Sequence, residues 1–526
     1  MAIKFLYGAA VQGIQGFIFQ TNKLKEIVGA SELVEDICTI QFVEELRGED
    51  YSYDKKANGI AYSEAKKYLQ EDNNAIINAA GNIKYIFDNE EACKKMVREF
   101  PRRIANFAPG ITISQAVVKI EDDKKIANVI DKLEEMLRAQ RNKPMRDLEL
   151  GLIGIRRSRQ TNMPVCHIKD DNFWDAATLA KLNYKKEVHL VDIIYKKRET
   201  TKNLCQKAFG IKYVKHQEIP YDTDDLTDKN NWIAVIHADG NGLGQVVKKI
   251  GTDREKFKAF SKELDIATTE AAQEAFNAVE DKFGQLKTFP IRPIVLGGDD
   301  LTVICRGDLA LDYVTAFLKA FEEKTKEHLG DILKKFNLFS DTGCLTACAG
   351  IAYVKASFPF YYGYELAEAL CGHAKKVAKK DSDVEAKKPA ESCLMFYKVN
   401  DSFVEDFSDM ERRTLKPQDH ISFAFGPYFL DNKNWTGYWT IDELKGIVKQ
   451  LKGEDGNKVK SSMRQWMTLL YEGEAQAEQR LDRIKEIQQN KSLVEKLTAP
   501  REKDGVKVYP AYDVLAINTI LNQETK

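Results

Sequence analysis

Two adjacent aspartates follow a glycine pair in the middle of the chain. The tetrapeptide Gly297-Gly298-Asp299-Asp300 lies between the apolar runs 294–296 and 301–304. This pattern predicts a strand, a tight turn and a second strand, with two carboxylates at the tip. Neighbouring carboxylates repel each other unless a cation lies between them, and glycine lets a bulky group such as a phosphate approach the backbone. The motif is a candidate metal-dependent phosphoryl-transfer site; the alternative is a solvated hairpin turn.

A third acid and a glycine-rich loop lie upstream of this hairpin. The apolar run 232–236 predicts a buried strand and is followed by the segment 237–244, His-Ala-Asp-Gly-Asn-Gly-Leu-Gly. Backbone N–H groups of such a loop can bind phosphate. Asp239 precedes the hairpin acids by 60 positions (299 minus 239), and the apolar stripe between Phe260 and Phe283 predicts a long helix. Strand, helix and hairpin in this order suit a palm-type domain, in which the three acids would meet at one sheet edge.

These residue types suit phosphoryl transfer with two divalent ions, Mg²⁺ or Mn²⁺, held about 3.5–4 Å apart. We assign Asp239 and Asp299 as metal ligands, and Asp300 as a further ligand or as the group that helps to deprotonate a 3′-hydroxyl. Lys375 lies on a lysine-rich predicted helix, 364–380, and either clamps a triphosphate or belongs to a solvated basic face. His237 fits a satisfied core or strand-end histidine better than a ligand. The backbone positions expected to approach phosphate are Gly240, Asn241, Gly242, Gly244, Gly297 and Gly298.

Bulk composition limits the classes of function. The chain has 526 residues with 79 basic and 80 acidic side chains, so its net charge of −1 gives no overall attraction to nucleic acid or to a membrane. This length predicts two to four domains. The nine cysteines form no C-x-x-C motif, which argues against a structural zinc site and a disulfide framework. We found neither a membrane span nor a signal peptide, and expect a cytoplasmic protein.

The first 150 residues echo the region 230–385. In our alignment Ala10 corresponds to Asp239, and Gly81-Asn82 corresponds to Asp299-Asp300, with offsets of 229 (239 minus 10) and 218 (299 minus 81). Similar offsets in the same order predict a duplicated domain. The alternative is two α/β domains that share only a strand–helix rhythm. The first copy has no metal-binding acid by this alignment, so it could bind a nucleotide through its backbone but should not hold catalytic metals.

On these residues the chain resembles the large palm-containing subunit of type III CRISPR effector complexes, whose palm is like that of GGDEF-type nucleotide cyclases. Segments 13–19 and 29–33 resemble the degenerate first palm of that family, and segments 237–242 and 358–360 resemble the second. The resemblance implies an α/β (α+β) fold with two ferredoxin-like palm domains in tandem and a C-terminal helical domain. The expected domains are 1–150 (degenerate palm), 151–229 (connecting helical segment), 230–390 (catalytic palm) and 391–526 (mainly helical).

The resemblance also implies an activity: two ATP molecules bind, and the active palm joins a 3′-hydroxyl to an α-phosphate with release of pyrophosphate. The product would be a cyclic or linear oligoadenylate messenger in antiviral defence. Family members often begin with an HD nuclease domain. None of the seven histidines here precedes Asp, so we expect an HD-less variant without that DNase activity. Cys166-His167 and Cys205 are too few ligands for the zinc site that many members carry between the palms.

The leading hypothesis is therefore an ATP-using nucleotidyltransferase, free-standing or a homodimer. One alternative is an assembly subunit that works only with other CRISPR effector subunits and target RNA. Another is a template-directed polymerase, against which the near-zero net charge argues. Residues 405–526 carry no evident chemistry: they are mainly helical in pattern, with a capping box at Thr440 and Glu443 and a long charge-striped stretch from Gln465 to Gln489.

Overall fold

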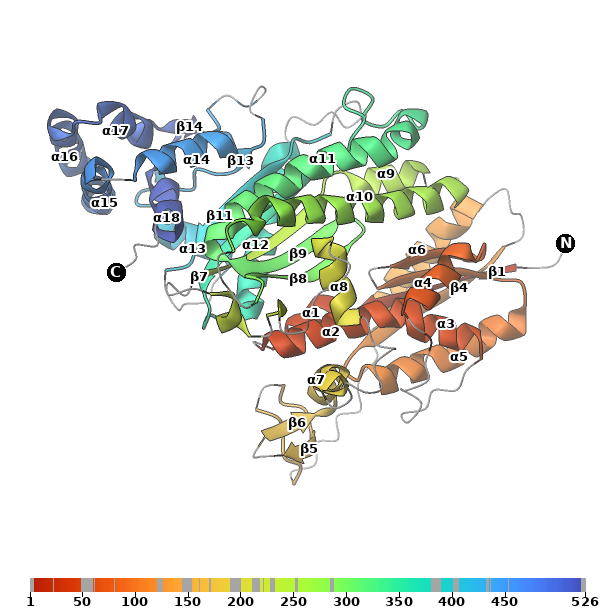
Figure 1. Ribbon diagram of the computed structural model, residues 1–526. Coiled ribbons are helices and arrows are strands. Elements are labelled where there is room, and N and C mark those ends of the chain that lie inside the picture. Colours follow the sequence, from red (N-terminus) through yellow and green to blue (C-terminus); the bar gives the residue numbers. More distant parts are fainter. Residues whose placement is uncertain are drawn as a thin grey trace. The chain divides into compact units, whose positions relative to one another are not determined.

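The computed structural model describes residues 4–21, 23–48, 60, 62–79, 81–120, 126–143, 154–159, 161–169, 172–189, 200–210, 218–220, 222–227, 232–250, 254–283, 288–379, 389–400, 406–431, 435, 437–452 and 454–521. The chain forms two compact units, each with its own central β-sheet (Figure 1). Unit 1 comprises Met1–Asp222, Leu243–Thr269 and Ile294–Gly298, and unit 2 comprises Thr223–Gly242, Glu270–Pro293 and Asp299–Lys526. The four-part division expected from the sequence stays a prediction.

Unit 1 contains a four-stranded antiparallel sheet and a separate two-stranded ribbon, β5 and β6. Its elements are β1 (Lys4–Gln12), α1 (Ile14–Phe19), α2 (Leu24–Asp36), the π-helix η1 (Ile37–Gln41), α3 (Phe42–Leu46), α4 (Tyr62–Glu71), β2 (Ala75–Ala79), β3 (Asn82–Phe87), α5 (Glu90–Phe107), β4 (Thr112–Ile120), α6 (Ile126–Arg141), β5 (Val165–Lys169), β6 (Asn172–Asp175), α7 (Ala176–His189), α8 (Thr200–Phe209), α9 (Leu243–Ile250) and the first part of α10 (Arg254–Glu280).

Unit 2 contains a six-stranded sheet followed by a helical region with a small three-stranded sheet. Its elements are η5 (Thr223–Leu226), β7 (Trp232–Gly240), the rest of α10, β8 (Ile291–Gly297, shared with unit 1), β9 (Asp300–Arg306), η6 (Gly307–Leu309), α11 (Ala310–Lys335), β10 (Ala347–Lys355), α12 (Phe360–Ala378), β11 (Cys393–Lys398), α13 (Phe407–Met410), η8 (Glu411–Leu415), β12 (Ile421–Ser422), β13 (Tyr428–Phe429), α14 (Ile441–Gln450), α15 (Glu454–Glu472), α16 (Glu474–Ile487), α17 (Lys491–Thr498), β14 (Arg501–Lys503), β15 (Val506–Val508) and α18 (Ala511–Leu521).

The two central sheets repeat one topology, which confirms the predicted tandem palm fold. The first sheet has the strand order β2-β3-β1-β4, and four strands of the second have the matching order β8-β9-β7-β10. In both, the first strand pairs antiparallel with the third and the fourth, as in a ferredoxin-like β-α-β-β-α-β unit. The second sheet is longer because β11 adds parallel to β10 and β13 adds antiparallel to β11.

Strand register supports the alignment of the two copies. In the first sheet Ala10 pairs with Asn82 on β3 and with Ser114 on β4. In the second sheet Asp239 pairs with Cys348 on β10, and the last β7–β9 pair, formed by Ala238 and Leu301, makes Asp239 and Asp300 the next residues of their strands. Ala10 and Asn82 therefore occupy the places of Asp239 and Asp300. The duplicated sheet has kept its register while losing its carboxylates.

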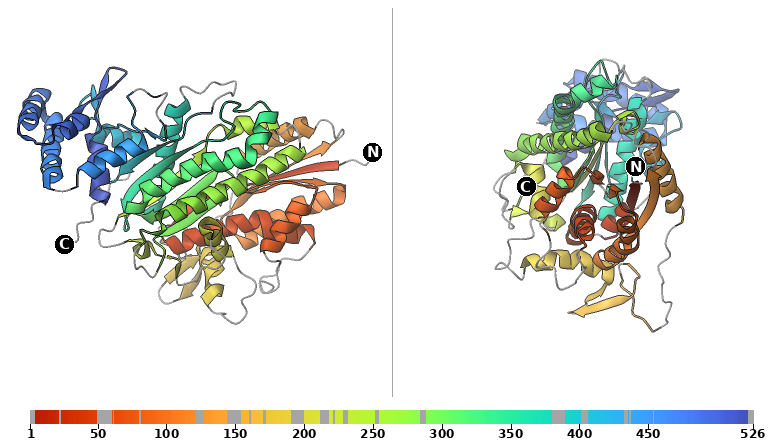
Figure 2. Two further views of the ribbon diagram at one scale, coloured as in Figure 1. Left: turned by 45° about the horizontal axis from the view of Figure 1, so that its top comes forward. Right: turned by 90° about the vertical axis from the view of Figure 1, so that its right-hand side faces the viewer.

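The long helix predicted between Asp239 and the hairpin is α10, which begins at Arg254. Figure 2 shows α10 and α11 side by side, and Lys324 of α11 forms ion pairs with Glu270 and Glu274 of α10. Every residue of the predicted apolar stripe that follows Arg254 is buried, so the three-to-four spacing identified the inner face correctly. These residues are Phe260, Leu264, Ala267, Ala271, Ala275, Val279 and Phe283.

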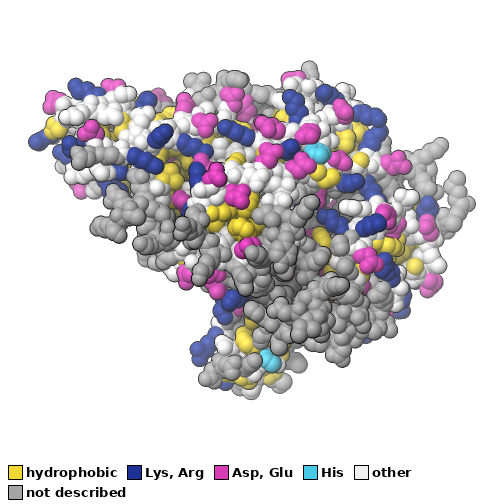
Figure 3. Space-filling model, in the orientation of Figure 1, with side chains coloured by type: hydrophobic (Ala, Val, Ile, Leu, Met, Phe, Trp, Pro, Cys, Tyr) yellow, Lys and Arg dark blue, Asp and Glu magenta, His cyan; other side chains and the backbone are white. Residues whose placement is uncertain are grey.

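The C-terminal region is mainly helical, as predicted. Thr440 and Glu443 form the expected capping box at the start of α14. The charge-striped stretch is divided at Gly473, which separates α15 from α16. No helix among the described residues is both long enough and apolar enough to cross a membrane. On the face drawn in Figure 3, basic and acidic side chains are interspersed, in keeping with the balanced composition.

Helix α12 packs on the second sheet without an intervening side chain at Gly350. A Cβ atom there would lie 1.9 Å from the carbonyl oxygen of Ala367 and 2.6 Å from the amide nitrogen of Cys371. Both atoms belong to the helix backbone and cannot move independently of it. Glycine at this position of β10 thus sets how closely α12 approaches the sheet.

We predict that Gly350→Ala destabilises the protein by about 1–3 kcal/mol or more, because the added methyl group must push α12 away from β10. Its melting temperature should fall by roughly 2–12 °C in a thermal denaturation experiment. Gly372→Ala on α12 is the matched control, since a Cβ atom at Gly372 would meet no atom within 4 Å. The control should be neutral or slightly stabilising, since alanine favours the helix; equal melting temperatures for the two variants would contradict the packing argument.

Candidate active site

The structure brings the three predicted acids together in unit 2. Asp239 is the next-to-last residue of β7, and Asp300 is the first residue of β9. Asp299 lies in the two-residue turn between β8 and β9, where Gly298 has a φ of +62°. Glycine adopts that angle without the strain that a Cβ causes. Asp299 is hydrogen-bonded with Asp239, so the carboxylates meet across the strand ends.

This crowding changes the acidity of the hairpin acids. Burial, followed by the charge of Asp239 and hydrogen bonding with it, raises the pKa of Asp299 from 3.8 to about 7. Burial and the charge of Asp239 also raise the pKa of Asp300 to about 7, and the Lys375 ammonium partly opposes this rise. Without a further cation, the site therefore retains protons that ordinary aspartates lose. A divalent cation is the kind of charge that would let all three ionise at neutral pH.

Lys375 supplies one positive charge. Its Nζ atom donates to Asp239 Oδ2 and, over 2.8 Å, to the carbonyl oxygen of Gly240. The Lys375 side chain is only 15% exposed, whereas Lys376 and Lys379 of the same helix are exposed. Lys375 is therefore bound to the carboxylates and is not a member of a solvated basic face. An ammonium at this place neutralises part of the acidic charge and could contact a phosphate group.

An unpaired oxygen of Asp300 indicates that the three aspartates could bind a cation. Asp300 Oδ1 is buried and has no hydrogen-bond partner among the described residues. The Nε2 atom of His237 lies 3.8 Å from this oxygen, beyond hydrogen-bond distance. A buried, unpaired acceptor is costly. Because Mg²⁺ and Mn²⁺ prefer carboxylate oxygens, these three aspartates are a suitable donor set for such ions.

The loop after β7 is fastened to the start of β10. Asn241 is 1% exposed; its backbone N–H donates to Thr346 O over 2.8 Å, and its Nδ2 donates to Thr346 Oγ1 over 3.1 Å. Gly242 has a φ of +73°, and a Cβ there would lie 3.3 Å from the ring of Phe339. Asn241 and Gly242 thus fix the conformation of the loop, and the side chain of Asn241 holds the loop to Thr346.

Three other glycines, at which the sequence predicted that a phosphate could approach the backbone, belong to unit 1. They are Gly244, Gly297 and Gly298, and a Cβ at any of them would meet no atom within 4 Å. The carbonyl oxygen of Gly298 accepts a hydrogen bond from Thr268 Oγ1 over 2.6 Å, which ties the hairpin tip to α10. Their backbone is therefore uncrowded, as close approach of a bulky group requires.

Sequence reasoning missed Thr302. It lies opposite His237 in the β7–β9 register, and its hydroxyl oxygen is 3.2 Å from His237 Nδ1. His237 is 6% exposed, and burial lowers its pKa against the opposing charges of Asp239 and Glu368. The two-residue period of strands could have identified this pair, because His237 shares a face of β7 with Asp239 and Thr302 shares a face of β9 with Asp300.

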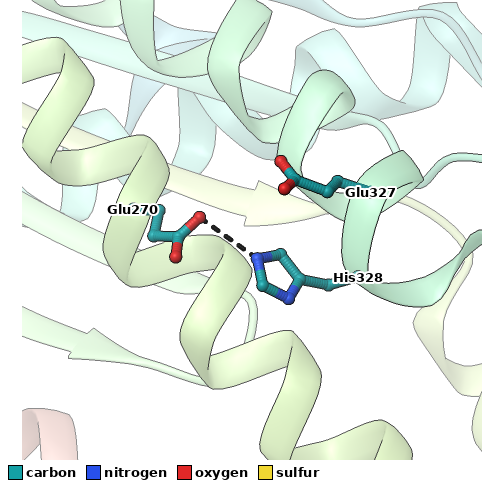
Figure 4. Close-up of side chains that lie close together, drawn as sticks. All are labelled: Glu270, Glu327 and His328. Carbon is teal, nitrogen blue, oxygen red and sulfur yellow. Dashed lines mark hydrogen bonds and ion pairs between the residues drawn. The ribbon is translucent and has the colours of Figure 1, made fainter.

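A second acidic cluster lies between α10 and α11 (Figure 4). Ligand atoms of Glu270, Glu327 and His328 lie within 4.8 Å of one another, and His328 Nε2 is 3.1 Å from Glu270 Oε2. Lys324 Nζ already lies 3.7 Å from Glu270 and 3.3 Å from Glu327. A resident ammonium neutralises these carboxylates, so the cluster is best described as an ion-pair network that joins two helices.

We predict that the contribution of Asp299 and Asp300 to the stability of the metal-free protein falls as the pH rises from about 4 to 7. Asp299 and Asp300 bind their protons more tightly in the folded state, at a pKa of about 7, than in the unfolded chain. The stabilisation from these protons is complete below about pH 4 and is lost as the pH rises through 7. Asp299→Asn should therefore raise the melting temperature measured with EDTA at pH 8 and change it little at pH 5.

Asp442→Asn is the control for this experiment, because the Asp442 side chain is 70% exposed on α14. Its melting temperature should match the wild type at both pH values, since an exposed ion pair contributes little. Added Mn²⁺ should stabilise the wild type more at pH 8 than at pH 5. An Asp299→Asn protein less stable than the wild type in EDTA at pH 8 would show that the carboxylate crowding is not costly.

Comparison with known proteins identifies the second palm. Residues 232–384 match the family Cas10/Cmr2, second palm domain. The chain is similar in structure to a Csm1–Csm4 cassette in complex with cA3, with a TM-score of 0.50, 14% identity, and coverage of 99% of this chain and 69% of that chain. It is also similar to an apo Csm1–Csm4 cassette, with a TM-score of 0.50, 13% identity, and coverage of 98% and 70%. No curated protein sequence matched.

At these identities the structural similarity concerns the fold, and it agrees with the tandem ferredoxin-like sheets. The family match covers the strands and helix that carry Asp239, Asp299, Asp300 and Lys375. Residues 232–384 are thus similar to the second palm domain of the Cas10/Cmr2 family, and the chain shares its fold with the Csm1–Csm4 cassettes.

Proposed function

We propose that this chain is a metal-dependent nucleotidyltransferase that uses ATP to make a cyclic or linear oligoadenylate messenger in antiviral defence. The observation that carries the proposal is the meeting of Asp239, Asp299 and Asp300 beside Lys375, with an unpaired buried oxygen on Asp300. Burial and the charge of Asp239 raise the pKa of both Asp299 and Asp300 to about 7. Such perturbed carboxylates are typical of functional sites.

The similar structures support the class of product. One Csm1–Csm4 cassette of the same fold is described in complex with cA3. We infer that the present chain acts on the same kind of nucleotide, with ATP as the substrate. We assign this chemistry to residues 232–384, which carry the three carboxylates; the family match of this region to a second palm domain supports the assignment.

The reaction would be attack of a 3′-hydroxyl oxygen on the α-phosphorus of ATP. The new O–P bond forms, the bond from the α-phosphorus to the bridging oxygen breaks, pyrophosphate leaves, and the hydroxyl proton is transferred to a base. Asp239, Asp299 and Asp300 would hold two Mg²⁺ or Mn²⁺ ions. When bound, such ions neutralise the phosphate oxygens and make the hydroxyl more acidic. Protein groups mainly position the reactants and stabilise charge in such reactions.

The chain's own residues have distinct tasks in this scheme. Lys375 holds Asp239 in place and adds a positive charge near the developing charge on the phosphates. Asp300, with a pKa near 7, is suited to accept a proton at neutral pH if it is not a metal ligand. Gly240, Asn241 and Gly242 fix the loop after β7, and Gly297 and Gly298 leave room for a phosphate at the hairpin.

We propose a passive role for the first palm. Ala10 and Asn82 occupy the positions of Asp239 and Asp300, and Gly81 corresponds to Asp299. Gly81 has a φ of +78°, so it makes a turn but offers no carboxylate. The first palm would bind a second ATP through backbone groups and would hold no catalytic metal.

We predict that purified protein incubated with ATP and Mg²⁺ or Mn²⁺ releases pyrophosphate and forms a phosphodiester product. Asp299→Ala with Asp300→Ala should reduce both signals to background, because the donor set for the ions is lost. Pyrophosphate release and mass spectrometry of the nucleotide product are the measurements. Asp442→Asn should keep the wild-type rate. Recovery of unchanged ATP with every metal and RNA tested would refute the proposal.

Partners form the second part of the proposal. Because similar structures are Csm1–Csm4 cassettes, we infer that this chain can assemble with CRISPR effector subunits and RNA. Co-purification with such chains, and product formation only with target RNA, would favour an assembly subunit. Product formation by a monomer or a homodimer alone would favour a free-standing synthase. Extension of a primer on a template would instead indicate a polymerase.

A further inference from the structure

His237 occupies a defined place beside the carboxylates. It lies on β7 directly opposite Thr302 of β9, and both side chains are buried, with exposures of 6% and 1%. The edge-to-face contact with Tyr364 of α12, at 5.7 Å between ring centroids and 74° between planes, restricts rotation of the imidazole. The ring thus has one nitrogen, Nδ1, facing Thr302 Oγ1 at 3.2 Å and the other, Nε2, facing Asp300 Oδ1 at 3.8 Å.

The chemistry of the three groups decides which nitrogen carries the proton. An ionised Asp300 can only accept, so a bare Nε2 beside it would place two lone pairs against each other. The Thr302 hydroxyl can rotate and donate to Nδ1, which leaves the proton on Nε2. If the ring is charged, both nitrogens carry protons and Thr302 accepts instead. An N–H group therefore faces an ionised Asp300 whether the ring of His237 is neutral or charged.

We propose that His237 is a positioning residue for Asp300: its Nε2–H group, set by the hydroxyl of Thr302, holds the Asp300 carboxylate in the orientation that binds a divalent cation. This inference rests on the proposed function. The distance of 3.8 Å would shorten to a hydrogen bond when Asp300 takes part in metal binding. Partners of metal ligands commonly act in this way, by orienting a ligand and strengthening it.

The first palm provides an internal comparison. Strand register places Gly8 opposite Lys84, where the second palm has His237 opposite Thr302. A Cβ at Gly8 would lie 2.7 Å from Leu133 Cδ2, so α6 fills the space that an imidazole would need. The copy that lacks the carboxylates thus also lacks the histidine and the hydroxyl. This joint absence is expected if His237 and Thr302 act through Asp300.

The test compares one substitution that keeps a donor near the place of His237 Nε2 with one that keeps only a group near the place of Nδ1. In His237→Gln the terminal NH₂ can reach the place of Nε2 and can still donate to Asp300, whereas His237→Asn places its amide near Nδ1 and loses that donor. Thr302→Ser keeps the hydroxyl, and Thr302→Val removes it with little change in shape. His373→Asn is the matched control, because that half-buried imidazole of α12 contacts Phe407 and not the aspartates.

The primary measurement is the dissociation constant for Mn²⁺, determined by electron paramagnetic resonance with and without a non-hydrolysable ATP analogue. We expect His237→Asn to weaken Mn²⁺ binding by about 10–100-fold. His237→Gln should stay within a few-fold of the wild type, Thr302→Ser should match it, and Thr302→Val should lie between. The Mn²⁺ concentration for half-maximal pyrophosphate release should shift in parallel, and excess Mn²⁺ should restore much of the rate.

The melting temperature in EDTA separates this role from a structural one. A histidine that only fills the core would lower the melting temperature in both His237 variants and leave Mn²⁺ affinity unchanged, which would overturn the inference. Equal loss of Mn²⁺ affinity in His237→Asn and His237→Gln would also overturn it, because the retained donor would then have no effect. Failure of the wild type to bind Mn²⁺ at all would overturn the proposed function together with this inference.

Discussion

Mutual repulsion among carboxylates is the constraint that governs the second palm. Asp239, Asp299 and Asp300 are brought together by two strand ends and one tight turn, and their partial burial raises the pKa of Asp299 and Asp300. One ammonium, from Lys375, cannot neutralise three acids. The fold therefore holds a site that is unfavourable without a further cation, and this stored cost is what would make metal binding strong.

The surrounding sheet supplies the rigidity that such a site needs. Asp239 is on β7, a central strand that pairs on both sides along its length, and Asp300 begins the neighbouring strand. Lys375 reaches the acids from α12, whose approach to the sheet is set by the absence of a side chain at Gly350. Backbone pairing and close helix packing thus fix the positions of groups that would otherwise move apart.

The two sheets show how one fold can be kept while its chemistry is lost. Strand order and register are the same in both sheets. The carboxylates of the second sheet lie at strand ends and in the turn between β8 and β9. Their replacement by Ala10, Gly81 and Asn82 therefore leaves the first sheet intact, and it removes the electrostatic cost that the second sheet carries.

Much of the fold and the identity of the candidate acids could be predicted from the sequence alone. Alternating apolar runs around Gly297-Gly298-Asp299-Asp300 specified the hairpin, the spacing from Phe260 to Phe283 specified the buried face of α10, and Thr440 with Glu443 specified the start of α14. These signals are local, since they depend on the period of one element or on the chemistry of one cap. The duplication could also be predicted, because the same motifs recur in the same order in residues 1–150 and 230–385.

Only the tertiary structure decided how these elements act on one another. Whether Lys375 was solvated or bound to Asp239 depended on how α12 packs against β10, a contact between segments far apart in the chain. The contact of His237 with Thr302, and the unpaired oxygen of Asp300, depended on the register between β7 and β9. The hydrogen bond from the side chain of Asn241 to Thr346 joins two segments that are far apart in the chain. Hydrogen bonds and electrostatic shifts arise from short distances across strands and helices, and no single stretch of sequence contains those distances.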